Sequence, residues 1–220
     1  MNTLVPETAE TALEGGLLGR VQYWFACSFV IGWTAFVGAG LFHQLGFHEI
    51  PCPLCVVQRM FMLLAAVGAG WVIRTALGDG AVTGRDYMAG WGMALVAVVG
   101  GSAAAGRQTL LHALPGNEGY GSSLLGLHLY VWAWVLFTVS AVAIGVVLAF
   151  AHATADRVVP AARPGPHRAA GTFALGFLGV VIAVSAAAVF LDEGFHWFLP
   201  QEPTPYRPFH GPPLDTDLPR

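Results

Sequence analysis

Five long runs of apolar residues without a charged side chain constrain this chain more than any other feature. They cover residues 21–42, 60–73, 88–106, 124–151 and 169–191. The hydrocarbon core of a bilayer is about 30 Å thick, and a helix of about 20 apolar residues crosses it. Four runs reach or approach that length, and the second does so if its helix starts near Pro53 and includes Arg59. The sequence therefore predicts an all-α integral membrane protein with five transmembrane helices.

The composition supports the same class of protein. Hydrophobic residues make up 55% of the chain and charged residues only 10%, whereas soluble domains carry roughly 25% charged residues. The segments between the runs are too short and too poor in charge to cover a soluble core of this size. The chain has no lysine, and its arginines lie mostly at the ends of the apolar runs, so nucleic acid is not indicated as a partner.

The placement of the arginines predicts the orientation in the membrane. Six of them fall on one side: Arg20, Arg74, Arg85, Arg157, Arg163 and Arg168. The other side has four: Arg59, Arg107, Arg207 and Arg220. Short loops rich in arginine stay in the cytoplasm, so we expect a cytoplasmic N-terminus and a periplasmic C-terminus. Residues 1–20 lack a basic start before an apolar run, so they do not read as a cleavable signal peptide.

Cys52 and Cys55 form the motif Pro51-Cys52-Pro53-Leu54-Cys55, where a periplasmic link becomes the second helix. Proline is tolerated in a first helical turn, and the positive end of the helix dipole favours a thiolate there. This spacing lets a disulfide open and close, and the periplasmic face is oxidising. We therefore expect a redox-active pair. Cys27 lies early in the first helix, far from this face, and is predicted to be a packing residue.

Arg59 lies four residues after Cys55, so the two share a helix face. An arginine inside a transmembrane helix is costly and is usually functional. We expect its guanidinium to stabilise negative charge on a bound quinone oxygen or on the thiolate. The alternative is that it reaches toward lipid headgroups.

Arg107, Gln108 and His112 end the third helix on the same side of the membrane, and the last two are spaced i, i+4. We predict that they bind a quinone carbonyl or supply protons to a reduced ring. Ordinary polar residues of the membrane interface would give the same pattern.

These motifs resemble the disulfide-bond formation protein B (DsbB) family of bacterial inner-membrane quinone reductases. The resemblance rests on Gln44 and Pro51-Cys52-Pro53-Leu54-Cys55-Val56-Val57-Gln58-Arg59, on the segment from Gly106 to Pro115, and on Leu124-Leu125-Gly126-Leu127. It covers residues 20 to 150. It implies that Cys52 exchanges disulfides, that Cys55 lies against ubiquinone or menaquinone, and that Arg59 binds the ring. Gln108 and His112 fall where the family carries polar groups of the quinone site.

The apolar runs and the segments between them predict a domain organisation, and the resemblance implies that its first four helices form one bundle. We expect a cytoplasmic segment (1–20), a four-helix transmembrane domain (21–151), a cytoplasmic linker (152–168), an extra transmembrane helix (169–191) and a proline-rich periplasmic tail (192–220).

The chain departs from the family in one informative way. DsbB-like proteins typically carry a second cysteine pair between helices 3 and 4, which relays electrons from the soluble oxidase DsbA. Here that loop is short and has no cysteine. The expected partner is a thioredoxin-like thiol protein, either periplasmic or membrane-tethered, which reaches Cys52 directly.

Two other functions remain open on the sequence. His43, His48, Cys52 and Cys55 have residue types that suit a tetrahedral zinc site. Alternatively, the chain is an accessory subunit of a larger membrane complex, because the fifth helix and the aromatic, proline-rich tail suit a partner.

Overall fold

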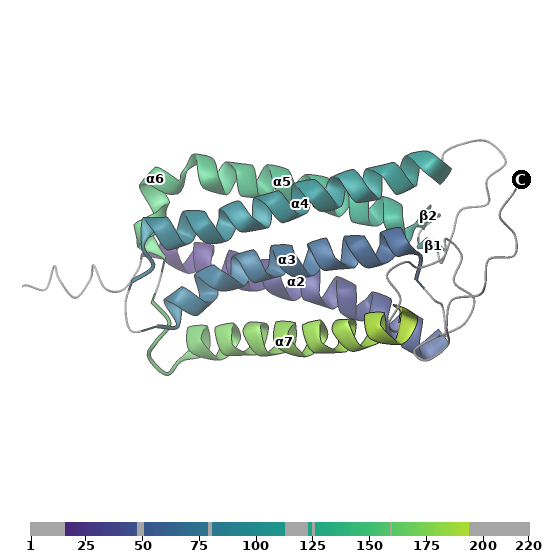
Figure 1. Ribbon diagram of the computed structural model, residues 1–220. Helices are drawn as coiled ribbons and strands as arrows, with labels where there is room; N and C mark the ends of the chain where they lie inside the picture. The colour runs from purple at the N-terminus through teal and green to yellow at the C-terminus, as the bar shows by residue number, and fades with distance from the viewer. Residues whose placement is uncertain are drawn as a thin grey trace, which may run out of the picture.

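Five long helices dominate the computed structural model, which describes residues 16–47, 51–78, 81–112, 123–124, 126–158 and 160–193. They are α2 (Leu17–Phe47), α3 (Pro53–Ala76), α4 (Gly84–His112), α5 (Leu129–Ala149) and α7 (Pro166–Glu193). The five lie side by side along one long axis (Figure 1). Each is long and apolar enough to cross a bilayer. The predicted all-α membrane fold with five transmembrane helices is therefore confirmed.

Helix α3 holds the bundle together, because it packs against α4, α2 and α7. Helix α5 packs on α4, and the rings of Trp33 on α2 and Phe137 on α5 stack with their centroids 4.7 Å apart. Through these contacts the four helices α2, α3, α4 and α5 form one bundle. Helix α7 lies outside it, along α2 and α3 (Figure 1). The arrangement is the predicted four-helix bundle with an added fifth helix.

The fourth transmembrane helix begins later than the apolar run suggests. Ser123–Leu124 (β1) and Leu127–His128 (β2) pair as antiparallel strands, and α5 starts only at Leu129. Gly126 lies between the strands with φ of 78°, a left-handed conformation that glycine adopts without steric cost. The turn therefore replaces the first helical turn that hydropathy alone indicates.

The segment that joins α5 to α7 packs against the bundle. It contains α6 (Ala151–Thr154) and a short 3-10 helix, η1 (Ala155–Arg157). The Ala161 N–H then donates to the Ala76 carbonyl at 2.6 Å, and Ala161 and Val158 are buried in the core. Because proline suits a first helical position, α7 begins at Pro166, three residues before the predicted start.

At its other end, α7 continues past the predicted boundary at residue 191. Asp192 belongs to the helix and is buried, with 7% of its surface exposed. The sequence assigned this residue to the proline-rich tail, which from residue 194 onward lies outside the described residues.

Helices α3 and α4 approach closely at two glycines. A Cβ on Gly90 would lie 2.8 Å from the Gly68 carbonyl oxygen and 2.8 Å from Val72 Cγ2. A Cβ on Gly68 would lie 2.6 Å from the Ala94 nitrogen. Small residues allow such backbone contact between membrane helices, where packing rather than hydrophobic burial drives association.

We expect Gly90→Ala to destabilise the protein by about 1–3 kcal/mol, because the added methyl must push α3 and α4 apart. Gly92→Ala is the matched control, since a Cβ at Gly92 meets nothing within 4 Å and alanine favours a helix by up to about 1 kcal/mol. Reversible unfolding in mixed detergent measures both free energies. Equal stability of the two variants would contradict the close contact.

Candidate redox site

The candidate site forms where α3 begins. Cys52 is the N-cap of α3, Pro53 is its first residue, and the Cys55 N–H donates to Cys52 Sγ at 3.2 Å. Proline lacks the N–H that would be unpaired at this position. The Cys52 sulfur thus caps the helix in the way a serine or aspartate oxygen usually does. This capping geometry brings the two cysteines together within one turn.

Gln108 of α4 reaches both sulfurs. Its Nε2 lies 3.4 Å from Cys52 Sγ and 3.5 Å from Cys55 Sγ. The orientation of the amide is set from behind, because Gln58 Nε2 donates to Gln108 Oε1 at 2.6 Å. Gln58 and Gln108 are both buried. With its oxygen occupied, Gln108 presents its N–H groups to the sulfurs.

The two cysteines are free thiols in this structure. Cys52 is buried, with 9% of its surface exposed, and Cys55 is half-buried. The pKa of Cys52 is raised, first by its hydrogen bond with the Cys55 sulfur and then by burial. The Cys52 thiol accordingly keeps its proton when the pair is reduced.

Arg59 belongs to a second polar group beside the cysteines. Its Nη1 donates to Gln44 Oε1 at 2.8 Å, and Gln44 Nε2 donates to Asp192 Oδ2 at 2.8 Å. All three side chains are buried. They come from α3, α2 and α7, so this group ties the fifth helix to the four-helix bundle.

His112 and Arg107 lie apart from the sulfurs. His112 Nδ1 is 2.9 Å from the Gln108 carbonyl oxygen of its own helix, and its ring lies 5.3 Å from that of Tyr130 on α5. Arg107 is exposed and lines a groove of about 400 Å³ between α4 and α5 with Trp134 and Thr138. Successive helical residues point about 100° apart, so Arg107 faces away when Gln108 faces the cysteines.

The structure thus brings Cys52, Cys55 and Gln108 into direct contact, and it places Arg59 one turn further along α3. Sequence reasoning did not assign a role to Gln44, Gln58 or Asp192. The signal for the two glutamines was available, because an amide inside an apolar run must find a buried partner. Cys27 lies in the hydrophobic core and is 1% exposed, as expected for a packing residue.

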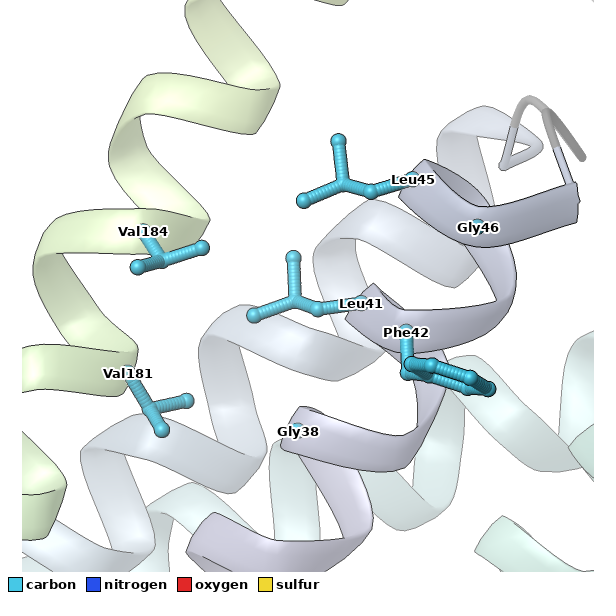
Figure 2. Close-up of a pocket in the computed structure, with 7 residues that line it drawn as sticks. All are labelled: Gly38, Leu41, Phe42, Leu45, Gly46, Val181 and Val184. Carbon is cyan, nitrogen blue, oxygen red and sulfur yellow. The ribbon is translucent and has the colours of Figure 1, made fainter.

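An apolar groove of about 470 Å³ runs between α2 and α7 near this end of the bundle. Figure 2 shows Leu41 and Leu45 pointing from α2 toward α7, where Val181 and Val184 point back. The groove has no polar lining side chain, so it offers shape without hydrogen-bond donors.

The zinc hypothesis gains no geometric support in the described part of the chain. Within those residues, no group of three or more histidine, cysteine or acidic side chains is close enough to hold a metal ion. His48, one of the four residues proposed, lies outside them. His43 instead packs its ring against Phe42 and Phe47, at centroid distances of 6.3 Å and 5.3 Å.

Fold and site together define a multi-pass helical membrane protein with a Cys-x-x-C pair, one cysteine buried and one half-buried, at the start of one transmembrane helix. Residues 22–119 match the model of the family DsbB, described as disulfide bond formation protein DsbB. The chain is also 32% identical over 84 residues to disulfide bond formation protein B 1 of Pseudomonas syringae pv. syringae (strain B728a). Over residues 22–119 the chain is therefore similar to the DsbB family.

The matches have limits in length. The alignment covers 38% of this chain and 46% of the Pseudomonas protein, so the chain spans less than half of the relative it matches. No solved structure matches the chain. The family match includes most of α2 and all of α3 and α4, with both cysteines and Gln108, whereas α5 and α7 lie beyond it.

We expect Gln108→Leu to slow alkylation of the cysteine pair by iodoacetamide, because the shared N–H donor stabilises a thiolate. A hydrogen bond to a charged group contributes about 1.5–3 kcal/mol, or roughly tenfold to a hundredfold in rate. Thr109→Val is the control, since Thr109 bonds only the Ala105 carbonyl among its described contacts. Unchanged alkylation in Gln108→Leu would remove this residue from the site.

Proposed function

We propose that this chain is a quinone-dependent thiol:disulfide oxidoreductase. A thiol donor reduces the Cys52–Cys55 disulfide, and a membrane quinone reoxidises the pair. The contact of one amide, Gln108 Nε2, with both sulfurs carries the proposal. Packing alone does not require a donor aimed at two sulfurs. A pair that alternates between disulfide and thiolate gains from such a donor at every turnover.

The exchange with the donor takes two steps. A donor thiolate attacks the Cys52 sulfur, the Cys52–Cys55 bond breaks, and its electron pair goes to Cys55. The second donor thiolate then attacks the donor sulfur that is bonded to Cys52, and the donor leaves as a disulfide. The donor has lost two electrons and two protons, and Cys52 and Cys55 hold them as thiols.

The residues around the pair serve these steps. The first sulfur to be released is Cys55, which lies in the first turn of α3 beside the positive end of its dipole. Gln108 stabilises the negative charge there through its N–H group. Cys52 takes the second electron pair, and its raised pKa then favours the neutral thiol.

The donors near Cys55 suit a quinone, whose two carbonyl oxygens accept hydrogen bonds. Arg59 supplies a buried guanidinium one turn along α3, and Gln108 supplies an amide from α4. His112 lies one turn beyond Gln108 and is half-buried, where it can pass protons. When bound, the quinone accepts two electrons and two protons and leaves as a quinol, which restores the disulfide. Ubiquinone and menaquinone both carry the required carbonyls.

The orientation and the partner follow from the same proposal. The end of the bundle that carries Cys52 faces the periplasm, and the N-terminus lies in the cytoplasm of a bacterial inner membrane. Only three cysteines are present, so no second pair relays electrons. The donor is a thioredoxin-like thiol protein that docks at the membrane surface, and membrane tethering brings it there most readily.

Purified protein in lipid nanodiscs should reduce a soluble ubiquinone analogue when supplied with a reduced thioredoxin-like protein. We expect Cys52→Ser and Cys55→Ser to abolish this turnover, because neither can form the disulfide. Cys27→Ser should keep it, since Cys27 lies in the core away from the pair. Absorbance of the quinone measures the rate. A wild-type protein without turnover would favour the accessory-subunit alternative.

We expect Cys55→Ser to trap the donor as a mixed disulfide through Cys52 when the donor is supplied in its oxidised, disulfide form. The Cys52 thiolate attacks the donor disulfide, one donor sulfur leaves as a thiolate, and no Cys55 thiolate is present to release the donor from Cys52. Non-reducing electrophoresis and mass spectrometry identify the trapped protein and the bonded cysteine. The control is Cys52→Ser, which should trap much less. If the donor is instead trapped on Cys55, the assigned order of the two cysteines is wrong.

A further inference from the structure

The fifth helix ends in an acidic residue that faces the interior of the bundle. Along α7, Val181, Ser185, Ala188 and Asp192 are all buried, at 6%, 4%, 2% and 7% exposure. Their spacing of four, three and four residues defines one helix face. Asp192 is therefore the last inward position of that face, and α7 packs through it on α2 and α3.

The position of Asp192 is unfavourable on local grounds. The last turn of a helix carries the negative end of the dipole, so a carboxylate there is repelled. Burial adds a desolvation penalty. Charged residues that persist within membrane helices face the bundle interior, pair with one another and serve function. The opposite charge that can compensate the Asp192 carboxylate is the Arg59 guanidinium on α3, which Gln44 links to it.

Gln44 links Asp192 to Arg59 in a defined order. The Gln44 oxygen accepts from Arg59 Nη1, and the Gln44 Nε2 donates to Asp192 Oδ2, both at 2.8 Å. Because one end of this amide needs a donor and the other an acceptor, its orientation is fixed by both neighbours. The carboxylate thereby holds the amide, and the amide holds the guanidinium.

We propose that Asp192 is a positioning residue of the redox site, which acts through Gln44 to hold Arg59 and to balance its charge. The fifth helix is then a working part of the site. This inference rests on the proposed function, in which Arg59 binds the quinone. It goes beyond the family match, because residues 22–119 do not include α7. Asp192 itself touches neither the sulfurs nor the quinone in this proposal.

The experiment compares Asp192→Asn with wild type in nanodiscs, with separate titrations of quinone and thiol donor. Loss of the charged hydrogen bond should raise the KM for quinone roughly tenfold. The KM for the thiol donor should stay within about twofold, since Cys52 and Gln108 are untouched. Ser185→Ala, on the same buried face of α7, controls for packing and should change neither value. An unchanged KM for quinone in Asp192→Asn would overturn the proposal.

A double-mutant cycle separates positioning from general damage to the fold. If Asp192 acts through Arg59, Asp192→Asn should have no further effect on the KM for quinone in the Arg59→Gln background. An equal loss in both backgrounds would show a merely structural role and overturn the proposal.

The same cycle is measured on the midpoint of thermal unfolding, which requires no turnover. The two substitutions should be non-additive there, and additive midpoints would contradict the inferred link. If wild-type protein reduces no quinone, the proposed function fails, and this stability cycle alone decides whether Asp192 holds Arg59.

Discussion

Every polar side chain buried at the cysteine end of the bundle has to find its partner within the protein, because the surrounding hydrocarbon offers none. Gln108 meets this requirement through Gln58 on one side and the two sulfurs on the other. An apolar residue at position 108 would leave Gln58 without this acceptor and would remove the side-chain donor that the two sulfurs share. The geometry of the cysteine pair therefore depends on a requirement that the surrounding lipid imposes, namely that buried polar groups find partners inside the protein. The N-cap contact of Cys52 then fixes where the pair lies along α3.

The need of buried polar groups for partners also explains why α7 contacts the polar group around Arg59. Arg59 is nearly fully buried, and a guanidinium in this environment needs acceptors and an opposing charge. Gln44 provides the acceptor from α2, and Asp192 extends the group from α7. The apolar part of α7 requires only a surface on which to pack, which α2 and α3 provide. The polar end of α7 specifies its register along them, since sliding by one turn would separate Asp192 from Gln44.

Hydropathy predicted the number of helices because the bilayer imposes a length and an apolar composition on each one. Local chemistry predicted the start of α3, because Pro53 suits a first helical position, whereas the capping role of Cys52 emerged only from the structure. Asp192 was missed because hydropathy identifies a membrane helix by the absence of charged residues. A charge ends an apolar run, and only a partner distant in sequence, here Gln44, explains why it is buried. The strand pair at residues 123–128 was missed because the conformation of Gly126 is decided by its turn.

The i, i+4 spacing of Gln108 and His112 predicted a shared face, but spacing cannot say which neighbour that face meets. Contact between α4 and α3 gives Gln108 the sulfurs, whereas His112, one turn later, meets Tyr130 of α5. Arg107 illustrates the converse. Its charge and its place at the helix end made it a candidate, yet the packing of α4 turns it outward. Side-chain type thus identifies candidate residues for a site in the membrane. The rotation of each helix about its axis then decides which of them face the site.

The burial of Cys52 has a consequence for partner choice. A donor thiolate must contact the sulfur that it attacks, and Cys52 is 9% exposed whereas Cys55 is half-buried. A small thiol makes few contacts with the protein, so its binding free energy is small. It therefore cannot offset the free-energy cost of exposing the buried Cys52 sulfur. A protein donor with a docking surface gains more binding free energy, and this can offset the cost of exposing the sulfur. If Cys52 receives the donor thiolate, as proposed, its burial favours a specific protein donor over small thiols.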